Sequence, residues 1–484
     1  MNSFYLSHSV RKFSVAIVAF FMLTSIVGLG YFVERSHSPT LLLAYSLAFG
    51  AYLLGYRLAQ TPPQVKQLLV VAVLARLLLI PMMPNLSDDI YRFVWDGRLL
   101  YQGHDPFAYL PSEIMQGEAA VNAVGIDQEL YNQLNSPNYY TIYPPVNQAV
   151  FALAAWLSPT SVRGSAIIIR LIIFTAELLT LWLLMQLLGT KHPSSLIPPL
   201  ISSLSARLPI IDTLLRRFPQ DKTTYRPPPR AILLYALNPL VIIELTGNLH
   251  FEALMITFVL GSVYLLRQRK IGWSGVAMAL AVCTKLVPLI LLPLYLRRLG
   301  WERALLFYAV VGITTALLFL PLITPELLVG MRNSVGLYFQ KFEFNASVYY
   351  LIREIGFYQK GYNIIQSAGR WLAISTFLMI VLYALLERQR LLASFGWVWL
   401  IFLLLSTTVH PWYVAPLLAF TVFTPYRYAV LWSGLIFFSY AGYTTTGFSE
   451  NLWITGLEYG AVLGMLGYEV IGRRKPLADR QLDA

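Results

Sequence analysis

The sequence predicts an all-α membrane protein, a polytopic bundle of about 13–15 transmembrane helices. Of its 484 residues, 57% are hydrophobic and only 12% are charged, about half the charged share of an average soluble protein. The net charge of +12 is divided among basic clusters between apolar runs, such as "RQRK" at 267–270 and "GRRK" at 472–475. Such clusters are typical of cytoplasmic loops, and they argue against a nucleic-acid-binding face.

The first apolar run and the cysteine content narrow the class further. The run from Phe13 to Phe32 is long enough to cross a bilayer, and no A-x-A-like cleavage site follows it. We therefore predict an anchor and not a removed signal peptide. The single cysteine, Cys283, lies inside an apolar run. One cysteine excludes an internal disulfide and argues against a metal–thiolate site.

Charge placement orients the first part of the chain. The first three predicted spans lie near 13–33, 40–58 and 67–83. Their basic flanks are Arg11, Lys12, Arg57 and Lys66. These flanks place the N-terminus inside, and three crossings then place the segment 85–143 outside. That segment carries eight Asp or Glu but only two Arg and no Lys, as expected of an outer loop.

Further spans are predicted along the rest of the chain, near 144–158, 165–188, 230–246, 250–266, 303–321, 368–386, 394–410, 412–424, 427–443 and 452–471. They divide the protein into an N-terminal transmembrane pair at 1–66, a transmembrane catalytic module at 67–471 and a cytoplasmic tail at 472–484. The module has two large outer loops, at 84–143 and 322–366. Both termini lie inside, and the polar residues that are unusual for a membrane protein gather on the outer side.

Two stretches need the charge rule to be placed. The segment 196–214 holds three prolines and Arg207, which make it a poor helix. We predict that it crosses, because otherwise the basic stretch 216–230 would lie outside, and an interfacial helix is the alternative. The stretch 272–296 has basic flanks on both sides and Lys285 in its middle. Two half-helices meeting at "TKLVP" would return it to the cytoplasm, with Lys285 lining a protein cavity.

The stretch "SDDIYRFVWDGRLLYQGHDPFAY" at 87–109 predicts a helix at the outer end of the third span. Ser87 suits the N-cap, Asp88 and Asp89 suit the first turn, and Gly103 ends the helix. Asp89, Arg92 and Asp96 would share one side of an amphipathic helix lying along the outer interface. Capping, together with Asp88–Arg92 and Arg92–Asp96 pairs, is the alternative account of these charges.

A reaction that one or two carboxylates, and no nucleophilic Ser or Cys, can perform fits this placement. In glycosyl transfer from a lipid phosphate, a carboxylate takes the proton of an acceptor hydroxyl and the phosphate departs. The phosphate needs positive charge or N–H donors. The predicted outer ends of the spans supply Lys285, His250 and His410, and Arg92 and Arg98 lie close to the carboxylates in the sequence.

The order of five motifs resembles the GT-C membrane glycosyltransferases. The motifs are the stretch at 87–109, "YPPVNQAVFALAA" at 143–155, "NPLVIIELTGNLHFEAL" at 238–254, "GVAMALAVCTKLVPLILLPL" at 275–294 and "HPWYVAPLL" at 410–418. Within this superfamily the chain is most similar to the bacterial polyprenol-phosphate-mannose-dependent mannosyltransferases. The resemblance extends from about residue 85 to 420, and the first two spans before it would be an accessory pair.

The resemblance implies a helical enzyme of the bacterial inner membrane with its catalytic aspartate in the first large outer loop. It implies transfer of a hexose, and of mannose in particular, from polyprenyl phosphate to a glycan or lipid-linked acceptor outside, with inversion. By position the aspartate falls on Asp88 or Asp89. Related sequences often read Gly-His-Asn-Asp where this chain has "GNLHFEA"; here His250 is shifted and Glu252 stands for the acid, which weakens a role for Glu252.

The candidate site therefore consists of a base and a set of substrate-binding groups. The base is Asp88 or Asp89, and only one of them would face the acceptor, because adjacent helical residues point about 100° apart. The substrate-binding candidates are Arg92, Asp96, Arg98, Tyr143, His250, Lys285 and His410.

Each substrate-binding candidate has a structural alternative. Lys285 could pair with a buried Glu177 or Glu244. Histidines at helix ends could be capping or hydrogen-bonded groups. Tyr143 precedes two prolines that suit a helix start. Asn345, Tyr349 and Tyr350 could contact sugar, or the tyrosines could belong to an aromatic belt.

Two rival functions remain open from the sequence. A transporter or flippase of lipid-linked sugars would usually place ionisable groups near the bilayer midplane in repeated halves. A non-catalytic scaffold of an envelope-polysaccharide complex is the second rival. We expect no cofactor; a divalent metal at the aspartate pair is possible but not favoured, since a lipid phosphate needs less charge neutralisation than a nucleotide diphosphate.

Overall fold

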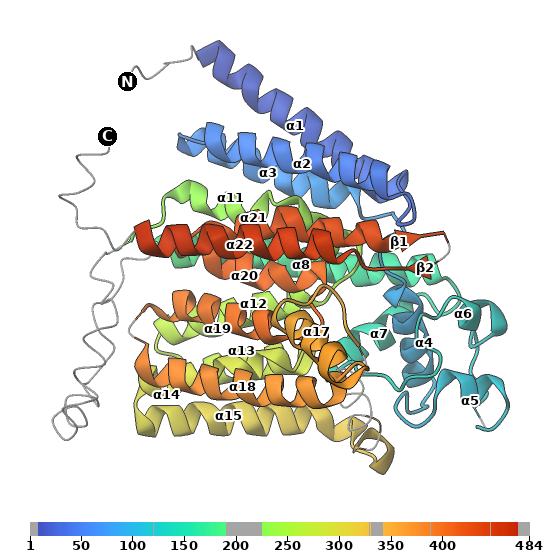
Figure 1. Cartoon of the computed structure of the whole chain (residues 1–484). Helices are drawn as coiled ribbons and strands as arrows, with labels where there is room; N and C mark the ends of the chain where they lie inside the picture. The colour runs from blue at the N-terminus through green and yellow to red at the C-terminus, as the bar shows by residue number, and fades with distance from the viewer. Residues whose placement is uncertain are drawn as a thin grey trace.

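A computed structural model describes residues 8–119, 121–189, 225–328, 330, 342–387, 389–445 and 447–472. In these residues the chain is an all-α helical membrane protein, as predicted (Figure 1). Two short strands, β1 (Tyr443–Thr444) and β2 (Gly447–Phe448), form one antiparallel hairpin. The predicted crossing at 196–214 and the predicted tail beyond residue 472 lie outside the described residues.

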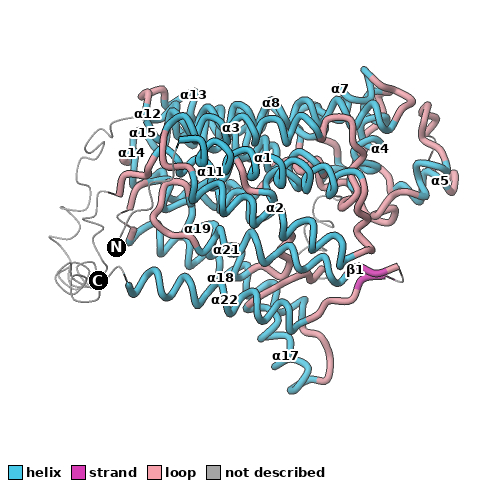
Figure 2. Tube along the Cα trace, turned by 90° about the horizontal axis from the view of Figure 1, so that it is seen from above, coloured by secondary structure: helices cyan, strands magenta, loops and turns pink. Residues whose placement is uncertain are grey.

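The long helices lie side by side as a bundle (Figures 1 and 2). They are α1 (His8–Tyr31), α2 (Ser38–Leu58), α3 (Pro62–Leu78), α8 (Val162–Gly189), α12 (Glu252–Arg267), α13 (Ile271–Thr284), α15 (Trp301–Phe319), α18 (Ile365–Leu386), α19 (Leu391–Leu405) and α22 (Leu452–Gly472). Their apolar faces pack into a continuous core that runs from Val15 in α1 to Val462 in α22.

Shorter and interrupted elements complete the bundle. At one end lie α4 (Asp89–Tyr101), α5 (Pro111–Met115), α6 (Gln128–Asn132), α7 (Pro145–Leu157) and α17 (Val348–Lys360). Interrupted segments are η1 (Pro229–Ile232), α11 (Leu233–Ala236), the π-helical η2 (Val241–Gly247), η3 (Val287–Leu291), α14 (Pro293–Leu299), η4 (Leu320–Leu322), η5 (Pro411–Val414), α20 (Ala415–Thr421), α21 (Tyr428–Leu435) and η6 (Ile436–Gly442).

Four helices are long and apolar enough to cross a membrane by length and composition. They are α2, α8, α15 extended to Leu322, and α18. A fifth candidate is the pair 229–236 and 241–247, bent by 55° at a break that contains Pro239, where no backbone N–H is available to continue the helix. The other predicted spans do not meet this test of length and composition in the described residues, so the predicted 13–15 crossings stay a prediction.

The helix containing Lys285 breaks where the sequence predicts. α13 ends at Thr284, and Lys285 is extended, with φ −148° and ψ 140°. The chain then returns through η3 and α14, and α14 lies at the end of the bundle opposite α4 (Figure 1). Lys285 is therefore the tip of a hairpin of two half-helices. Its tip faces the end of the bundle that holds α4, α5, α6 and α7, which we call the loop end.

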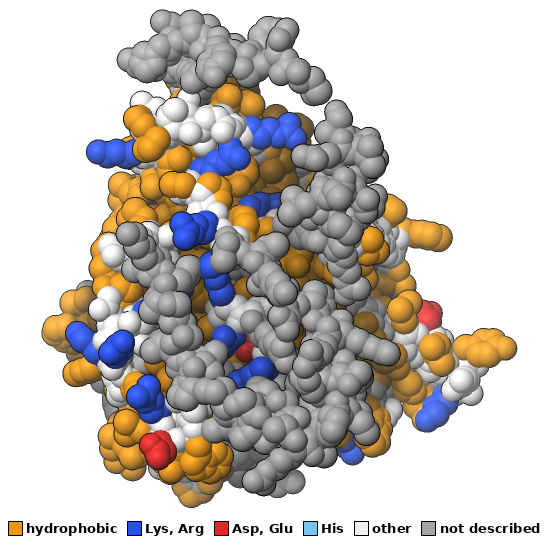
Figure 3. All heavy atoms as spheres, turned by 90° about the vertical axis from the view of Figure 1, so that its left-hand side faces the viewer, with side chains coloured by type: hydrophobic (Ala, Val, Ile, Leu, Met, Phe, Trp, Pro, Cys, Tyr) orange, Lys and Arg blue, Asp and Glu red, His pale blue; other side chains and the backbone are white. Residues whose placement is uncertain are grey.

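The opposite end of the bundle carries basic residues where several helices finish. Arg57 lies in the last turn of α2, Arg267 ends α12, and Arg297 and Arg298 lie in the last turn of α14. Figure 3 shows this end with Lys and Arg side chains at many places among apolar ones, and few acidic side chains. We call it the basic end, and its charge is the pattern expected of a cytoplasmic face.

The helix α4 differs from its prediction. It begins at Asp89, with Asp88 rather than Ser87 at the N-cap position, and it is buried on nearly every side. Arg92 and Arg98 are each only 3% exposed, because the segment that follows α4 folds back over it. Arg92 donates to the carbonyls of Ser136 and Tyr139, and Arg98 donates to that of Gly125. α4 is therefore packed inside the protein at the loop end, and its predicted position along the outer interface stays a prediction.

Candidate active site

The two adjacent aspartates at the start of α4 have different partners. Asp88 accepts an ion-pair hydrogen bond from Arg35 at 2.7 Å, and Arg35 lies in the link between α1 and α2. Asp89 instead accepts a hydrogen bond of 2.9 Å from the side chain of Asn135, in the loop after α6. Its backbone N–H donates to Ser87 Oγ. Asp88 therefore forms an ion pair with an arginine, whereas the hydrogen-bond partners of the Asp89 carboxylate in the described residues are neutral groups.

The surroundings of Asp89 favour its protonated form relative to an exposed aspartate. Partial burial raises the pKa of the Asp89 carboxyl, and the negative charge of Asp88 raises it further. The hydrogen bond from Asn135 and the positive charge of Lys285 act in the opposite direction. The positive charge of Lys285, at the tip of the α13 hairpin, thus acts on the carboxylate at the start of α4. A carboxylate with a raised pKa is a stronger base than an ordinary one.

Lys285 pairs with a carboxylate, although not with one the sequence suggested. Its Nζ lies 2.5 Å from Glu252 Oε1 at the start of α12, and 5.5 Å from the centre of the Tyr413 ring. The two carboxylates considered earlier have other partners. Glu177 binds Arg76 at 2.9 Å and Glu244 accepts from Tyr440 at 2.9 Å. The Lys285 side chain is 24% exposed, so the pair with Glu252 leaves the ammonium accessible.

The rings of His250 and His410 both stack on the ring of Trp412. The ring centroids of His250 and Trp412 are 3.7 Å apart, and those of His410 and Trp412 are 4.4 Å apart, with both pairs nearly parallel. Two buried atoms beside this stack, His410 Nδ1 and Glu252 Oε2, have no hydrogen-bond partner among the described residues. Buried polar atoms are costly unless they are satisfied, so these two atoms retain unused hydrogen-bonding capacity.

Tyr143 also lies beside the aspartates. Its ring packs edge-on against Phe93 of α4 at 5.0 Å and against Phe151 of α7 at 5.4 Å. Burial, followed by the charges of Asp89 and Asp96, raises the pKa of Tyr143 well above its ordinary value. The two prolines after it begin α7, as the structural alternative proposed, and the ring forms part of the wall next to Asp89.

Arg92, Asp96 and Arg98 do not join this cluster. Arg92 Nε donates to Asp96 at 2.8 Å, and Asp96 also accepts from Thr141 and Gln148. Asp96 is fully buried. These three side chains hold the segment 121–143 onto α4, and their predicted role in binding substrate stays a prediction.

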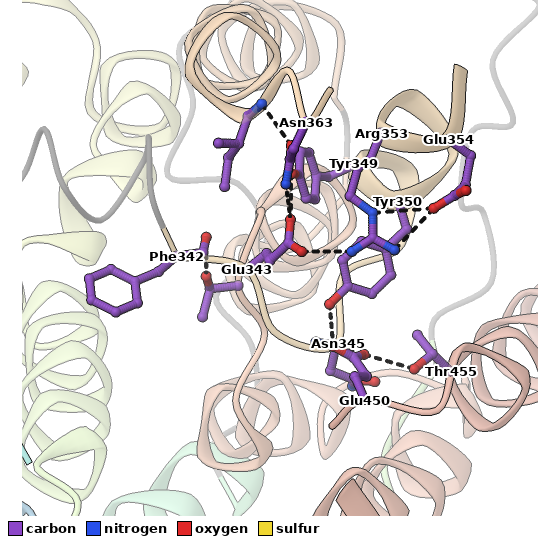
Figure 4. A network of polar contacts seen from close by, with 12 residues as sticks. Phe342, Glu343, Asn345, Tyr349, Tyr350, Arg353, Glu354, Asn363, Glu450 and Thr455 are labelled. Carbon is purple, nitrogen blue, oxygen red and sulfur yellow. Dashed lines mark hydrogen bonds and ion pairs between the residues drawn. The ribbon is translucent and has the colours of Figure 1, made fainter. Parts of the chain in front are cut away.

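The residues Asn345, Tyr349 and Tyr350 belong to a polar network at the loop end (Figure 4). Tyr349 donates to Glu343 at 2.6 Å, the backbone N–H of Asn345 donates to Glu450 at 3.0 Å, and Tyr350 also donates to Glu450. The network holds the segment on which Phe344 makes a parallel bridge with Thr408. Phe344 thereby packs 4.7 Å from the His410 ring, so the network supports the histidine stack.

Four members of the site were missed or undervalued by reasoning from the sequence. Arg35 and Asn135 carry no motif that points to the aspartates, and Trp412 was only part of the quoted "HPWYVAPLL". Glu252 was given little weight because it departs from the family pattern. One available signal was the pairing of Glu252 with a cation at the predicted break in 272–296, since a lysine at membrane depth needs a partner.

The site thus gathers Asp88, Asp89, His250, Lys285 and His410 at one end of the bundle. Among the residues that the structure describes, no group of three or more His, Cys, Asp or Glu side chains is arranged as a metal site. Part of the chain is similar to a known protein family. Residues 214–299 match the family model described as alpha-(1->6)-mannopyranosyltransferase, N-terminal domain. No curated protein matches the chain.

The matched segment includes both sides of the Glu252–Lys285 pair together with His250. It also contains two of the five motifs that carried the resemblance in the sequence, those at 238–254 and 275–294. The match supports a transferase acting on mannose. The chain is accordingly a helical membrane protein similar, over residues 214–299, to the mannosyltransferases of the GT-C type.

Proposed function

We propose that this protein is an inverting glycosyltransferase that moves a hexose, mannose by its similarity, from a polyprenyl-phosphate donor to a glycan or lipid-linked acceptor outside the membrane. The observation that carries the proposal is the Lys285–Glu252 pair of 2.5 Å at the tip of the α13 hairpin, whose positive charge acts on the carboxylate of Asp89. A base and a cation at the end of a membrane bundle are what transfer from a lipid phosphate requires.

In the proposed reaction Asp89 is the base. It takes the proton of the acceptor hydroxyl while the hydroxyl oxygen attacks the anomeric carbon from the face opposite the phosphate. The bond between the anomeric carbon and the phosphate oxygen breaks, and polyprenyl phosphate leaves. Attack from the opposite face inverts the configuration. Asp88 does not serve as the base in this scheme, because its carboxylate is already engaged in an ion pair with Arg35.

The departing phosphate gains one negative charge, since a phosphodiester becomes a monoester. Lys285 is the group proposed to meet this charge, with His250 and His410 as N–H donors. The pair with Glu252 at 2.5 Å holds the Lys285 ammonium at the hairpin tip before substrate binds. We propose that one ammonium suffices for a lipid phosphate and that no metal is needed, so transfer should continue in EDTA.

The test uses the full-length protein purified in detergent, with polyprenyl-phosphate-[³H]mannose as donor and a glycolipid extract of the host membranes as acceptor. Asp89→Asn should lower the rate of transfer by about 10²–10⁴-fold, the usual contribution of a general base. Glu129→Gln, at an exposed carboxylate of α6 in the same loop, is the matched control and should transfer normally.

The same preparations distinguish the rival functions. A transporter would move the labelled lipid across proteoliposomes without forming product, and a scaffold would do neither. Absence of transfer by the wild-type protein with every acceptor fraction would contradict the proposal, as would full activity of Asp89→Asn. Loss of activity in EDTA, restored by a divalent ion, would overturn the statement on metal.

A further inference from the structure

The link between α1 and α2 is hydrogen-bonded to the segment that leads into α4. Arg35, in this link, donates to Asp88 Oδ2 at 2.7 Å and to the carbonyl of Leu86 at 3.2 Å. Its guanidinium also lies 4.6 Å from the centre of the Tyr443 ring in β1. One side chain thus joins the N-terminal helix pair, the start of α4 and the C-terminal hairpin.

The segment before α4 also donates hydrogen bonds, to the end of α1 and to the loop that carries His250. The side-chain amide of Asn85 donates to the carbonyls of Leu29 and Val33, both at 2.7 Å, where α1 ends. The backbone N–H of Leu86 donates to the side chain of Asn248, at 3.2 Å. Residues 85–88 are therefore held by contacts to α1, to the α1–α2 link and to the loop that carries His250.

These contacts of residues 85–88 affect the proposed base, Asp89, in two ways. Asp88 is the N-cap residue of α4 and Asp89 is its first helical residue, so fixing Asp88 fixes the direction in which Asp89 points. Arg35 also supplies a positive charge next to Asp88, whose own charge raises the pKa of Asp89. Without Arg35 the full charge of Asp88 would act on its neighbour.

We propose that Arg35 is a positioning residue for Asp89, and that the N-terminal helix pair is therefore part of the catalytic unit. The sequence alone suggested an accessory pair, since the family resemblance begins only after it. This inference rests on the proposed function, in which Asp89 is the base. Arg35 acts through Asp88, and it is not itself assigned any contact with substrate.

The experiment measures the pH profile of kcat/KM for transfer by the full-length protein in detergent. In the wild type, activity falls as the pH drops through the pKa of Asp89, because the protonated carboxyl cannot accept a proton. Arg35→Gln should move this acid limb to higher pH by at least about 0.5 unit. It should also lower the plateau rate at least about tenfold, since a misplaced catalytic group loses rate steeply.

Two further variants separate charge from position. Arg35→Gln combined with Asp88→Asn should return the acid limb to the wild-type position or below it, because the like charge is gone, while the plateau stays low. Arg35→Lys keeps the charge, so its acid limb should stay in place. Arg163→Gln removes an exposed arginine that donates to the carbonyl of Pro81, and it should leave the profile unchanged.

A plateau loss in Arg35→Gln with no movement of the acid limb would overturn the proposal, since it would indicate a purely structural role. Wild-type behaviour of Arg35→Gln would overturn it as well. Failure of the proposed function has a different result: Asp89→Asn would remain active, whatever Arg35 does. Size-exclusion profiles and thermal shifts show which variants are folded, and Arg35→Lys keeps the proposal testable if Arg35→Gln is not.

Discussion

At the scale of single residues, the two aspartates illustrate how neighbours in sequence receive different chemistry. Asp88 meets an arginine from 53 positions away in the chain, whereas Asp89 meets a neutral amide and the field of Lys285. The first carboxylate is engaged in an ion pair, whereas the surroundings of the second raise its pKa. The choice between the two aspartates, which the sequence left open, thus follows from their partners.

Lys285 gives a testable prediction at the scale of single residues. Lys285→Met removes the charge proposed to meet the leaving phosphate, and we expect kcat/KM to fall about 10²–10³-fold. It also removes a positive charge that lowers the pKa of Asp89, so the acid limb of the pH profile should move to higher pH. Both effects are measured in the same transfer assay.

The control for this prediction is Lys285→Arg, which keeps the charge. It should leave the acid limb in place and lose less activity than Lys285→Met, although the planar guanidinium does not reproduce an ammonium. If Lys285→Met kept the wild-type acid limb, the electrostatic link between the α13 hairpin and α4 would be wrong.

The sequence located the acidic residues and Lys285 because each is rare in an apolar chain and sits at a predicted span end. It could not supply their partners, since Arg35 and Asn135 lie in ordinary links with no local pattern. Glu252 and Lys285 are 33 residues apart, and only the antiparallel packing of α12 on α13 brings them together. The candidate residues could be chosen from the sequence, but their hydrogen-bond and ion-pair partners could be found only from the fold.

At the scale of elements, the contact between α4 and α7 determines where the aspartates sit. Gly97 of α4 lies against the backbone of Phe151 in α7, and a Cβ added at Gly97 would lie 2.3 Å from the Phe151 carbonyl oxygen. Backbone cannot rotate away as a side chain can. The absence of a side chain at Gly97 therefore sets the closeness of the two helices.

Gly97→Ala should consequently force α4 away from α7. We expect a loss of stability of about 1–3 kcal/mol, as for overpacking in other cores, seen as a lower midpoint of thermal unfolding in detergent, together with weaker transfer. Gly50→Ala in α2, where nothing lies within 4 Å of the added Cβ, is the matched control. It should be neutral or stabilising, since alanine favours a helix over glycine.

An equal or higher unfolding midpoint for Gly97→Ala than for Gly50→Ala would contradict this packing.

The sequence predicted closely that α4 exists and where it starts. It also predicted correctly that the helix after α12 breaks at Lys285. It did not predict the surroundings of α4. Periodicity indicated an amphipathic helix at the outer interface, and no local pattern shows that residues 121–143 fold back to satisfy Arg92 and Arg98.

At the scale of the whole molecule, the ends of the bundle differ in charge and chemistry. The loop end holds the aspartates, the histidine stack and the Lys285 hairpin tip, while the basic end holds the arginines that finish α2, α12 and α14. Composition predicted the helical class, and loop charge predicted this separation. The number of crossings was harder to predict, since proline and buried polar groups interrupt helices that hydropathy treats as continuous.

The separation predicts the orientation in the membrane, with the loop end outside and the basic end inside. Cys283 is fully buried, so the native chain gives a low background for labelling with a membrane-impermeant maleimide. Val124→Cys introduces a thiol at a 68% exposed position of the loop end, and Gln268→Cys introduces one at an exposed position next to Arg267. In intact cells, Val124→Cys should react and Gln268→Cys should react only after permeabilisation. The reverse result would place Asp89 on the cytoplasmic side, where a donor and acceptor outside the membrane could not reach it.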